Sequence, residues 1–271
     1  MNRSDFPAIV IPKTLEEHLK WQCDNYNKSV GDMNLQDDYD CFECLNRGNF
    51  EVIDYKNLTT FKKDCRCMKI RRNILRFRQS GFGDSARNFT FEKYTTNEEW
   101  QKVAKQKAMQ YVRNYSGKWL FFHGQSGCGK THLCTAICME LIKKEHDVEY
   151  VSWRKLVHFF EGNRFNEENY SGKIRELQEV EILYIDDFLK TACKDNNGKI
   201  RPSENELNMA YEIVDSRVNS GKCMIISSEL SISDIASLEI ATGGRISEKS
   251  TGNQILVKYG ENRNYRFHGK E

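Results

Sequence analysis

The sequence predicts an α/β fold, a parallel sheet covered by helices on both faces, preceded by a small cysteine-rich module. Three observations predict it. A glycine-rich loop joins an apolar segment to a helical one at 118–142, strand and helix patterns alternate from residue 95 onward, and two close cysteine pairs lie within 41–67. Alternating strands and helices favour a parallel sheet, because each crossover helix covers one of its faces.

Composition sets the outer limits of this interpretation. The 271 residues are 39% hydrophobic and 30% charged, with a formal net charge of +2 and ten cysteines. This length allows one large domain, or an ordinary one with a small one. No apolar run reaches the roughly 20 residues of a membrane span, and the N-terminus has no signal-peptide layout. We therefore expect a cytoplasmic protein, in which cysteines are reduced or bind metal.

The chain opens with a polar segment and one helical signal. Thr14 can cap a helix whose third residue, Glu17, completes a capping box. A weak apolar stripe follows, at Leu15, Leu19 and Trp21. This helix either docks a partner or packs on the next module, and the sequence does not choose between the two.

Two cysteine pairs form the strongest signal of the N-terminal part. They are C-x-x-C and C-x-C pairs, separated by twenty residues of hairpin length, and consist of Cys41, Cys44, Cys65 and Cys67. Four thiolates in two close pairs are what a tetrahedral zinc site requires. A module of this size has too small a core to fold unaided, so zinc would supply much of its folding energy. Four unrelated free thiols remain the alternative.

A basic run follows the cysteines. Residues 62–78 hold eight Lys or Arg against one Asp, set in an apolar frame that predicts a basic amphipathic helix. Such a helix either follows a nucleic-acid backbone or is simply a solvated face. Residues 80–83 then break the helix and begin a linker that extends to about Tyr94.

The segment from residue 95 begins with a second capping signal. Thr95 to Glu99 predicts the start of a helix that continues to Val112. The further helices expected are 131–142, 153–160, 172–179, 203–218, 231–238 and 244–249, and the strands are 119–122, 149–152, 181–185, 222–228 and 254–257. A surface loop is expected at 191–201.

The loop after the first of these strands matches G-x-x-x-x-G-K-[ST] at every fixed position. Its residues are Gly124, Gln125, Ser126, Gly127, Cys128, Gly129, Lys130 and Thr131. Glycines let successive backbone N–H groups point at one anion, and the following helix adds its partial positive charge. We expect Lys130 to reach the β- and γ-phosphates of ATP and the Thr131 hydroxyl to bind Mg²⁺. His132 is counted with the nucleotide-binding residues.

A second strand supplies the carboxylates that such a loop needs. Asp186 and Asp187 follow four apolar residues, about fifty positions after Lys130. We expect Asp186 to hold Mg²⁺ and Asp187 to orient and polarise the attacking water. A helix-capping Asp at a strand end is the alternative.

Two further positions complete the predicted site. Ser228 and Glu229 end the next strand and are expected to face the γ-phosphate. Arg245 lies in a Gly-Gly-Arg-Ile segment that we place on a small loop at a helix start. It either enters the site of a neighbouring subunit as an arginine finger or forms a surface salt bridge.

Together these motifs resemble a DnaC/DnaI-type replicative helicase loader, an AAA+ ATPase close to the IstB-like ATPases, of phage or Gram-positive bacterial type. The resemblance rests on CFEC, CRC, RRNILRFRQSGF, FTFEKY, GQSGCGKT, ILYIDD, IISSEL and GGRISEK. It implies a helicase-interaction domain at residues 1–80, a linker at 81–94 and an AAA+ ATPase domain at 95–271. It also implies that the strand before Ser228 lies between the other two motif-bearing strands.

The resemblance implies an ATP-dependent loader of a hexameric DnaB-type helicase onto single-stranded DNA. The cofactors would be ATP or ADP, Mg²⁺ and Zn²⁺, and the adenine would lie near Phe91 and Tyr94. Self-association through the ATP site is implied as well. Lys173 and Arg175 are candidate DNA contacts. The alternatives are an IstB-like transposition helper ATPase, or a nucleic-acid adaptor in which ATP is a structural ligand.

This sequence departs from the family pattern at several points. Asp187 stands where most AAA+ proteins have Glu, which implies slow, switch-like hydrolysis. Glu229 stands where Asn is commoner. No helical lid is visible after Arg245, and Arg266 is a weak candidate for the arginine that a lid would carry.

Overall fold

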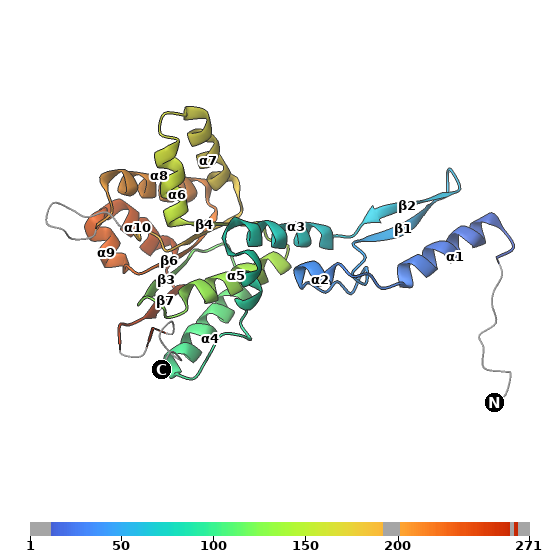
Figure 1. Ribbon diagram of the computed structural model, residues 1–271, viewed down its shortest axis with the longest axis horizontal. Coiled ribbons are helices and arrows are strands. Elements are labelled where there is room, and N and C mark those ends of the chain that lie inside the picture. The colour runs from blue at the N-terminus through green and yellow to red at the C-terminus, as the bar shows by residue number, and fades with distance from the viewer. Residues whose placement is uncertain (1–11, 192–200, 261–262, 265–271) are drawn as a thin grey trace. The chain divides into compact units, whose positions relative to one another are not determined.

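The computed structural model describes residues 12–191, 201–260 and 263–264 (Figure 1). The chain divides into two compact units, residues 1–72 and 73–271. Arg266 and most of the loop expected at 191–201 lie outside the described residues. Among the helices that the structure describes, none combines the length and the apolarity that a membrane span requires.

The N-terminal unit is built on a hairpin between the two cysteine pairs. Its elements are α1 (Leu15–Lys28), α2 (Asn34–Asp37), β1 (Asn49–Asp54), β2 (Thr59–Asp64) and the start of α3 (Cys67–Phe77). The two strands are antiparallel, with Asn49 opposite Asp64. The Thr14 capping box is present, as predicted, and the side chain of Asn27 hydrogen-bonds the backbone of Glu51 in both directions, which ties α1 to β1.

The basic run differs from the single basic amphipathic helix that we expected. Its first residues belong to β2, and the helix begins only at Cys67. Arg71 and Arg78 are buried, and Arg76 pairs with Asp147. The eight cations therefore do not form one exposed stripe, because several of them serve the packing of their own unit.

The second unit contains a five-stranded parallel sheet in the order β4-β5-β6-β3-β7. The strands are β3 (Leu120–Gly124), β4 (Val148–Ser152), β5 (Ile182–Asp186), β6 (Cys223–Ser228) and β7 (Gln254–Val257). The strand that ends at Ser228 lies between the strands that carry the phosphate loop and Asp186, as the resemblance implied. All three motifs therefore meet at one edge, where parallel strands end.

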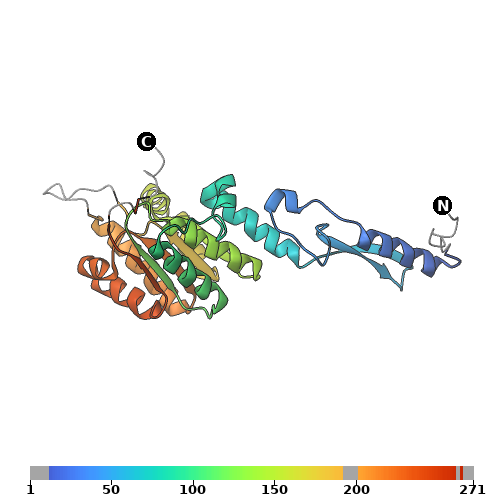
Figure 2. The same cartoon turned by 90° about the horizontal axis from the view of Figure 1, so that it is seen from below.

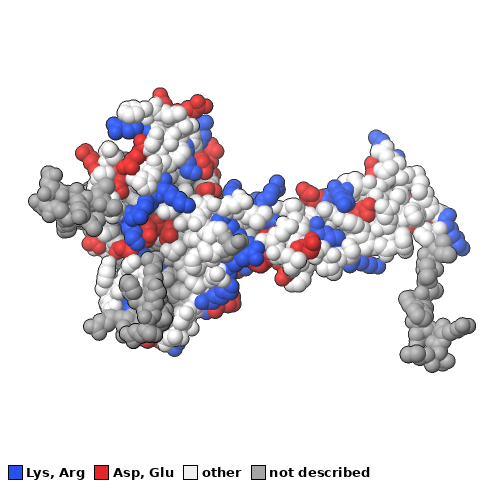
Figure 3. Space-filling view, in the orientation of Figure 1, with Lys and Arg blue, Asp and Glu red and all other residues white. Residues whose placement is uncertain are grey.

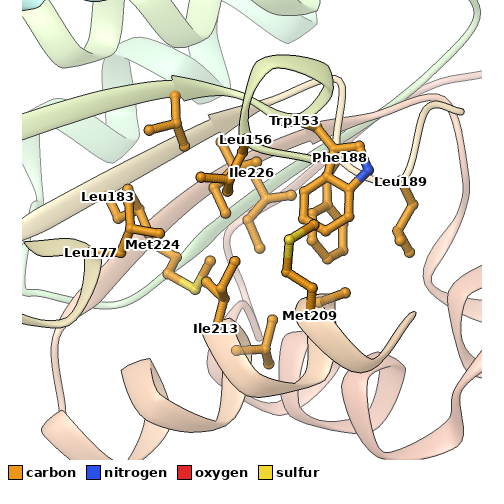
Figure 4. Close-up of a cluster of buried hydrophobic side chains, with 14 of the residues drawn as sticks. Trp153, Leu156, Leu177, Leu183, Phe188, Leu189, Met209, Ile213, Met224 and Ile226 are labelled. Carbon is orange, nitrogen blue, oxygen red and sulfur yellow. The ribbon is translucent and has the colours of Figure 1, made fainter. Parts of the chain in front are cut away.

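Helices cover both faces of this sheet (Figures 1 and 2). They are α4 (Glu99–Arg113), α5 (Lys130–Lys143), α6 (Trp153–Gly162), α7 (Glu167–Glu179), α8 (Glu204–Ser220), α9 (Ile232–Leu238) and α10 (Ile240–Lys249). On one face a large apolar cluster joins the sheet to α6 through α10. Figure 4 shows part of it, with Phe188 against Trp153 and Met209. The rings of Phe188 and Trp153 meet edge to face at 4.9 Å.

The segment that we expected to be a linker contains short helical turns, η1 (Arg78–Phe82) and η2 (Gly83–Asn88). The Phe82 ring lies 4.3 Å from that of Tyr150 on β4. A side chain at Gly81 would meet the same tyrosine at 2.1 Å. The start of this segment therefore packs on the sheet, whereas the domain boundaries themselves stay a prediction.

Three helices begin at residues other than those predicted, each because of an unforeseen cap. Glu98, not Thr95, caps α4 through Gln101. Asn166 caps α7, which begins five residues before Gly172. The carboxylate of Glu239 accepts from two N–H groups and starts α10 at Ile240. Arg245 thus lies well inside a helix, as the helix expected at 244–249 implied, and its placement on a small loop at the helix start is wrong.

Charged side chains of both signs are interspersed on the face in Figure 3, over the described residues of each unit. This distribution agrees with the net charge of +2. Any contact with an acidic partner therefore depends on local groups rather than on an overall field.

Candidate nucleotide and zinc sites

The phosphate loop connects β3 to α5 in a conformation that only glycine adopts easily. Gly127 and Gly129 have φ of 74° and 87°. A Cβ at Gly129 would lie 2.6 Å from the Tyr94 ring. Two independent constraints, backbone angle and space, thus require glycine here. The motif therefore forms the strand–loop–helix arrangement in which N–H groups cradle phosphates.

Lys130 is the first residue of α5 and is only 5% exposed. Its ammonium donates to the carbonyl oxygens of Gly124 and Gln125, at 2.8 and 3.0 Å. The buried cation is therefore satisfied by the loop itself. A nucleotide phosphate offers it a stronger, charge-assisted partner within the same loop.

Thr131 and Asp186 form the candidate magnesium site. The Thr131 hydroxyl donates to the Asp186 carboxylate at 3.0 Å. Tyr184 donates to the same carboxylate at 2.8 Å, and Ser227 donates to it as well. Burial raises the pKa of Asp186, with Asp187 adding to the effect. The Thr131 hydroxyl and the Asp186 carboxylate lie side by side and are the hard oxygen ligands that Mg²⁺ prefers, so these residues fit this ion.

Asp187 directly follows β5 and forms an ion pair with a lysine that was not among the predicted site residues. Lys190 lies 3.2 Å from Asp187 and 2.8 Å from Glu229. Burial opposes the negative charge of Glu229, but the hydrogen bond from Lys190, together with Ser126 and Lys130 of the phosphate loop, outweighs this effect and lowers the pKa of Glu229. Glu229 therefore lies near the phosphate loop with its charge neutralised by Lys190, and its contact with the γ-phosphate stays a prediction.

The Ser228 hydroxyl is fully buried and does not face the phosphate loop. It donates to the carbonyl of Phe188 at 2.8 Å and accepts from the N–H of Leu230. The neighbouring Ser227 reaches the Asp186 carboxylate instead. Strand alternation could have shown this, because Ile226 belongs to the core and Ser227 must point to the opposite face.

The candidate adenine side is aromatic and closely packed. Tyr94 donates to the carbonyl of Cys128 at 3.3 Å, and its ring lies 5.2 Å from that of His132. His132 also contacts the carbonyl of Thr90 at 2.8 Å, and burial lowers its pKa. Phe91 is 7% exposed. Tyr94 and His132 thus lie at the loop, and base contact by Phe91 stays a prediction.

Arg245 is engaged within its own chain. It lies 2.8 Å from Asp215 on α8, and its guanidinium stands 4.9 Å from the centre of the Tyr211 ring. Of the candidate DNA contacts, Lys173 pairs with Glu176 at 2.7 Å, and Arg175 is exposed. These contacts leave the predicted roles of all three residues untested.

The four predicted cysteines converge on one buried point. Their Sγ atoms all lie within 4.8 Å of one another. The Cys41–Cys65 and Cys44–Cys67 pairs are separated by 3.8 and 3.6 Å. Tetrahedral zinc with Zn–S bonds near 2.3 Å holds its sulfurs roughly 3.8 Å apart. The donor set and its spacing therefore fit zinc.

A buried ion pair supports this cysteine cluster. Arg71 is 1% exposed, lies 2.6 Å from Asp37, and donates to Asn46 at 3.0 Å. Asn46 in turn accepts the N–H of Cys41 at 2.7 Å. Outer contacts of this kind orient metal ligands. The sequence suggested only a basic face at this position.

Comparison with known proteins agrees with this geometry. Residues 86–248, more than half of the chain, match the family model of the bacterial DnaA ATPase domain. The uncharacterized protein YqaM of Bacillus subtilis is 26% identical over 207 residues, which cover 73% of this chain and 64% of that protein. The replicative helicase loader DnaC of Escherichia coli is 30% identical over 165 residues, 59% of this chain and 61% of DnaC. The chain thus spans less than two thirds of the length of either relative.

A crystal structure of the DnaC helicase loader matches the fold with a TM-score of 0.56 and 20% identity, over 65% of this chain and all of that one. At this identity the likeness shows the fold, which is the AAA+ type with a parallel sheet between helices. The chain belongs to the family of bacterial DnaA ATPase domains, in which it is similar to replicative helicase loaders of the DnaC and DnaI type.

Proposed function

We propose that this chain is an ATP-dependent loader of a hexameric, DnaB-type replicative helicase onto single-stranded DNA. The observation that carries the proposal is the pairing of Thr131 with Asp186 at 3.0 Å beside the phosphate loop. It joins the two halves of a magnesium–nucleotide site in a chain similar to a named helicase loader. Family membership supports a replication-initiation ATPase, and helicase loading is the finer step of the proposal.

Each residue of the nucleotide site has one task in this scheme. The N–H groups of residues 124–131 bind the phosphates, and Lys130 leaves its loop carbonyls to neutralise them. Thr131 and Asp186 hold Mg²⁺, which supplies charge neutralisation for phosphoryl transfer. Asp187 orients and polarises the attacking water. Its side chain is shorter than Glu, which fits slow hydrolysis that acts as a switch.

Arg245 of one subunit is proposed to act at the nucleotide site of the next subunit. In this role it would exchange its partner Asp215 for the phosphates bound by the next chain, and so make ATP the link between subunits. Subunits that lack Lys130 and subunits that lack Arg245 should then complement each other partly in mixtures. No regained ATP turnover in any mixture would exclude the role in trans.

The N-terminal unit is the proposed helicase-binding module, and zinc is proposed to hold it folded. Its four cysteines form a buried cluster, with Tyr39 and Phe50 packed against them. Lys173 and Arg175 on α7 are the proposed contacts to single-stranded DNA.

Two measurements test the proposal on the full chain. ATP turnover should rise with single-stranded DNA and vanish in Lys130→Ala, whereas Lys118→Ala, at an exposed lysine before β3, should behave as wild type.

The immobilised chain should capture the replicative helicase of its natural host. A zinc chelator or Cys44→Ser should abolish capture, and Cys23→Ser, at a buried thiol outside the cluster, should not. Capture of a transposase instead would favour a transposition helper.

A further inference from the structure

The turn after β5 has an unusual backbone. Asp187 and Leu189 have φ of 56° and 58°, in the left-handed region that non-glycine residues rarely adopt. Phe188 and Leu189 are almost fully buried in the large apolar cluster. Burial of these two side chains offsets the backbone strain, which is of order 1–3 kcal/mol per residue. The turn is therefore held in one conformation, and strain of this kind concentrates at functional sites.

The neighbouring strand β6 fixes the same turn by hydrogen bonds. The N–H of Phe188 donates to the carbonyl of Ser227 at 2.8 Å, and the N–H of Asp187 donates to the Ser227 hydroxyl at 3.1 Å. Ser228 donates to the carbonyl of Phe188. The N–H of Lys190 donates to the carbonyl of Asp187 at 2.9 Å and closes the turn. The Lys190 side chain consequently starts from a defined point beside Asp187.

From this point the Lys190 ammonium bridges two carboxylates. It lies 3.2 Å from Asp187 and 2.8 Å from Glu229, and its side chain is 31% exposed. Glu229 in turn lies near enough to Ser126 and Lys130 of the phosphate loop for both to lower its pKa. Lys190 thus connects a carboxylate beside the phosphate loop with the carboxylate that is proposed to face the attacking water.

The negative charge of Glu229 would oppose ATP binding unless Lys190 neutralises it. A carboxylate beside the phosphate loop repels a triphosphate more than a diphosphate, because the γ-phosphate adds negative charge at the strand edge. Lys190 cancels that charge, since its ammonium lies 2.8 Å from the Glu229 carboxylate. An unpaired Glu229 would therefore work against ATP binding.

We propose that Lys190 is a positioning residue of the nucleotide site, which neutralises Glu229 so that ATP is accepted and holds Asp187 in place for hydrolysis. The proposal rests on the nucleotide site described above. Its two parts are separable, because the first concerns affinity for ATP relative to ADP and the second concerns turnover.

The affinity arm uses ADP and a non-hydrolysable ATP analogue with Mg²⁺, titrated calorimetrically into full-length chain. Lys190→Met should weaken the analogue about tenfold or more, as expected for leaving a charge without its partner, and should change ADP affinity much less. Lys190→Arg should restore the wild-type ratio. The double variant Lys190→Met/Glu229→Gln should also restore analogue binding, since the unpaired charge is gone. Lys143→Met, which breaks a pair with Glu140 at the end of α5, should leave both affinities unchanged.

Measurement of kcat distinguishes the positioning of Asp187 from the neutralisation of Glu229. The double variant should bind the analogue as wild type does yet keep a low kcat, because nothing holds Asp187. Equal weakening of ADP and analogue in Lys190→Met, or no recovery in the double variant, would overturn the proposal. If Lys190→Met does not fold, Glu229→Gln is measured in its place. This variant should bind the ATP analogue more tightly than wild type, and weaker binding would contradict the proposal. A wild-type chain without ATP turnover would refute the proposed function, and the affinity arm would still judge Lys190.

Discussion

Replacement of Gly129 by alanine tests the phosphate loop most sharply. Its φ of 87° costs an L-residue about 1–2 kcal/mol. The new Cβ would lie 2.6 Å from the ring of Tyr94, which is 6% exposed and hydrogen-bonded to Cys128. Displacing this ring adds roughly 1 kcal/mol of overpacking. The total of about 2–3 kcal/mol should lower the Tm by about 4–12 °C for a unit of this size.

Gly244→Ala is the matched control. Gly244 lies in α10 with no atom within 4 Å of an added Cβ. Alanine there should stabilise the helix by about 0.5–1 kcal/mol and raise the Tm slightly. Circular dichroism melts and nucleotide titrations on both variants provide the measurement. Gly129→Ala should also weaken nucleotide binding about tenfold or more, because the N–H cradle changes shape. A wild-type Tm and affinity in Gly129→Ala would refute our account of the loop.

Three further predictions concern the other groups. Cys44→Ser should release about one zinc ion per chain in a metal assay and make the N-terminal unit protease-sensitive, because structural zinc supplies folding energy; an intact, metal-free unit would contradict this. Asp186→Asn should weaken nucleotide binding with Mg²⁺ and leave binding in EDTA nearly unchanged, since Asn keeps an oxygen that accepts hydrogen bonds but lacks the negative charge that would bind the ion; equal losses would point to another role. The pKa of Glu229 is lowered from 4.5, so its pairing stabilises the fold above pH 4.5 and this gain disappears as pH falls through the lowered pKa. The Tm difference between wild type and Glu229→Gln should therefore shrink in acid, and a constant difference would refute the pairing.

Local sequence signals predicted the sheet well, because each strand is a short apolar run bounded by polar residues. The runs before Asp186 and Ser228 became β5 and β6 within a residue or two of their predicted bounds. The helix expected at 203–218 and the four-cysteine cluster were likewise predicted. In each case the determining interactions lie within a few residues or in a fixed chemical pattern.

The sequence-based predictions failed where contacts between distant residues, or less common capping interactions, determine the structure. Two adjacent glycines before Arg245 favoured a loop, but capping by Glu239 and packing of Ile246 in the core keep them helical. Lys190 was overlooked because its partner Glu229 is 39 residues away. Ser228 was assigned to the phosphate because strand alternation was not applied at the strand end. The Ser228 error was thus avoidable from the sequence, whereas a contact such as that of Lys190 with Glu229 leaves no local signature.

The measurement that tests the central claim most directly is loading of the replicative helicase onto closed circular single-stranded DNA. The full chain, the host helicase and ATP are incubated with the circle, and helicase retained on DNA after gel filtration is counted. We predict retention that requires the chain and ATP, and that is lost in both Lys130→Ala and Cys44→Ser. Retention that is no greater with the chain than without it, under conditions in which the chain binds ATP and zinc, would contradict the account.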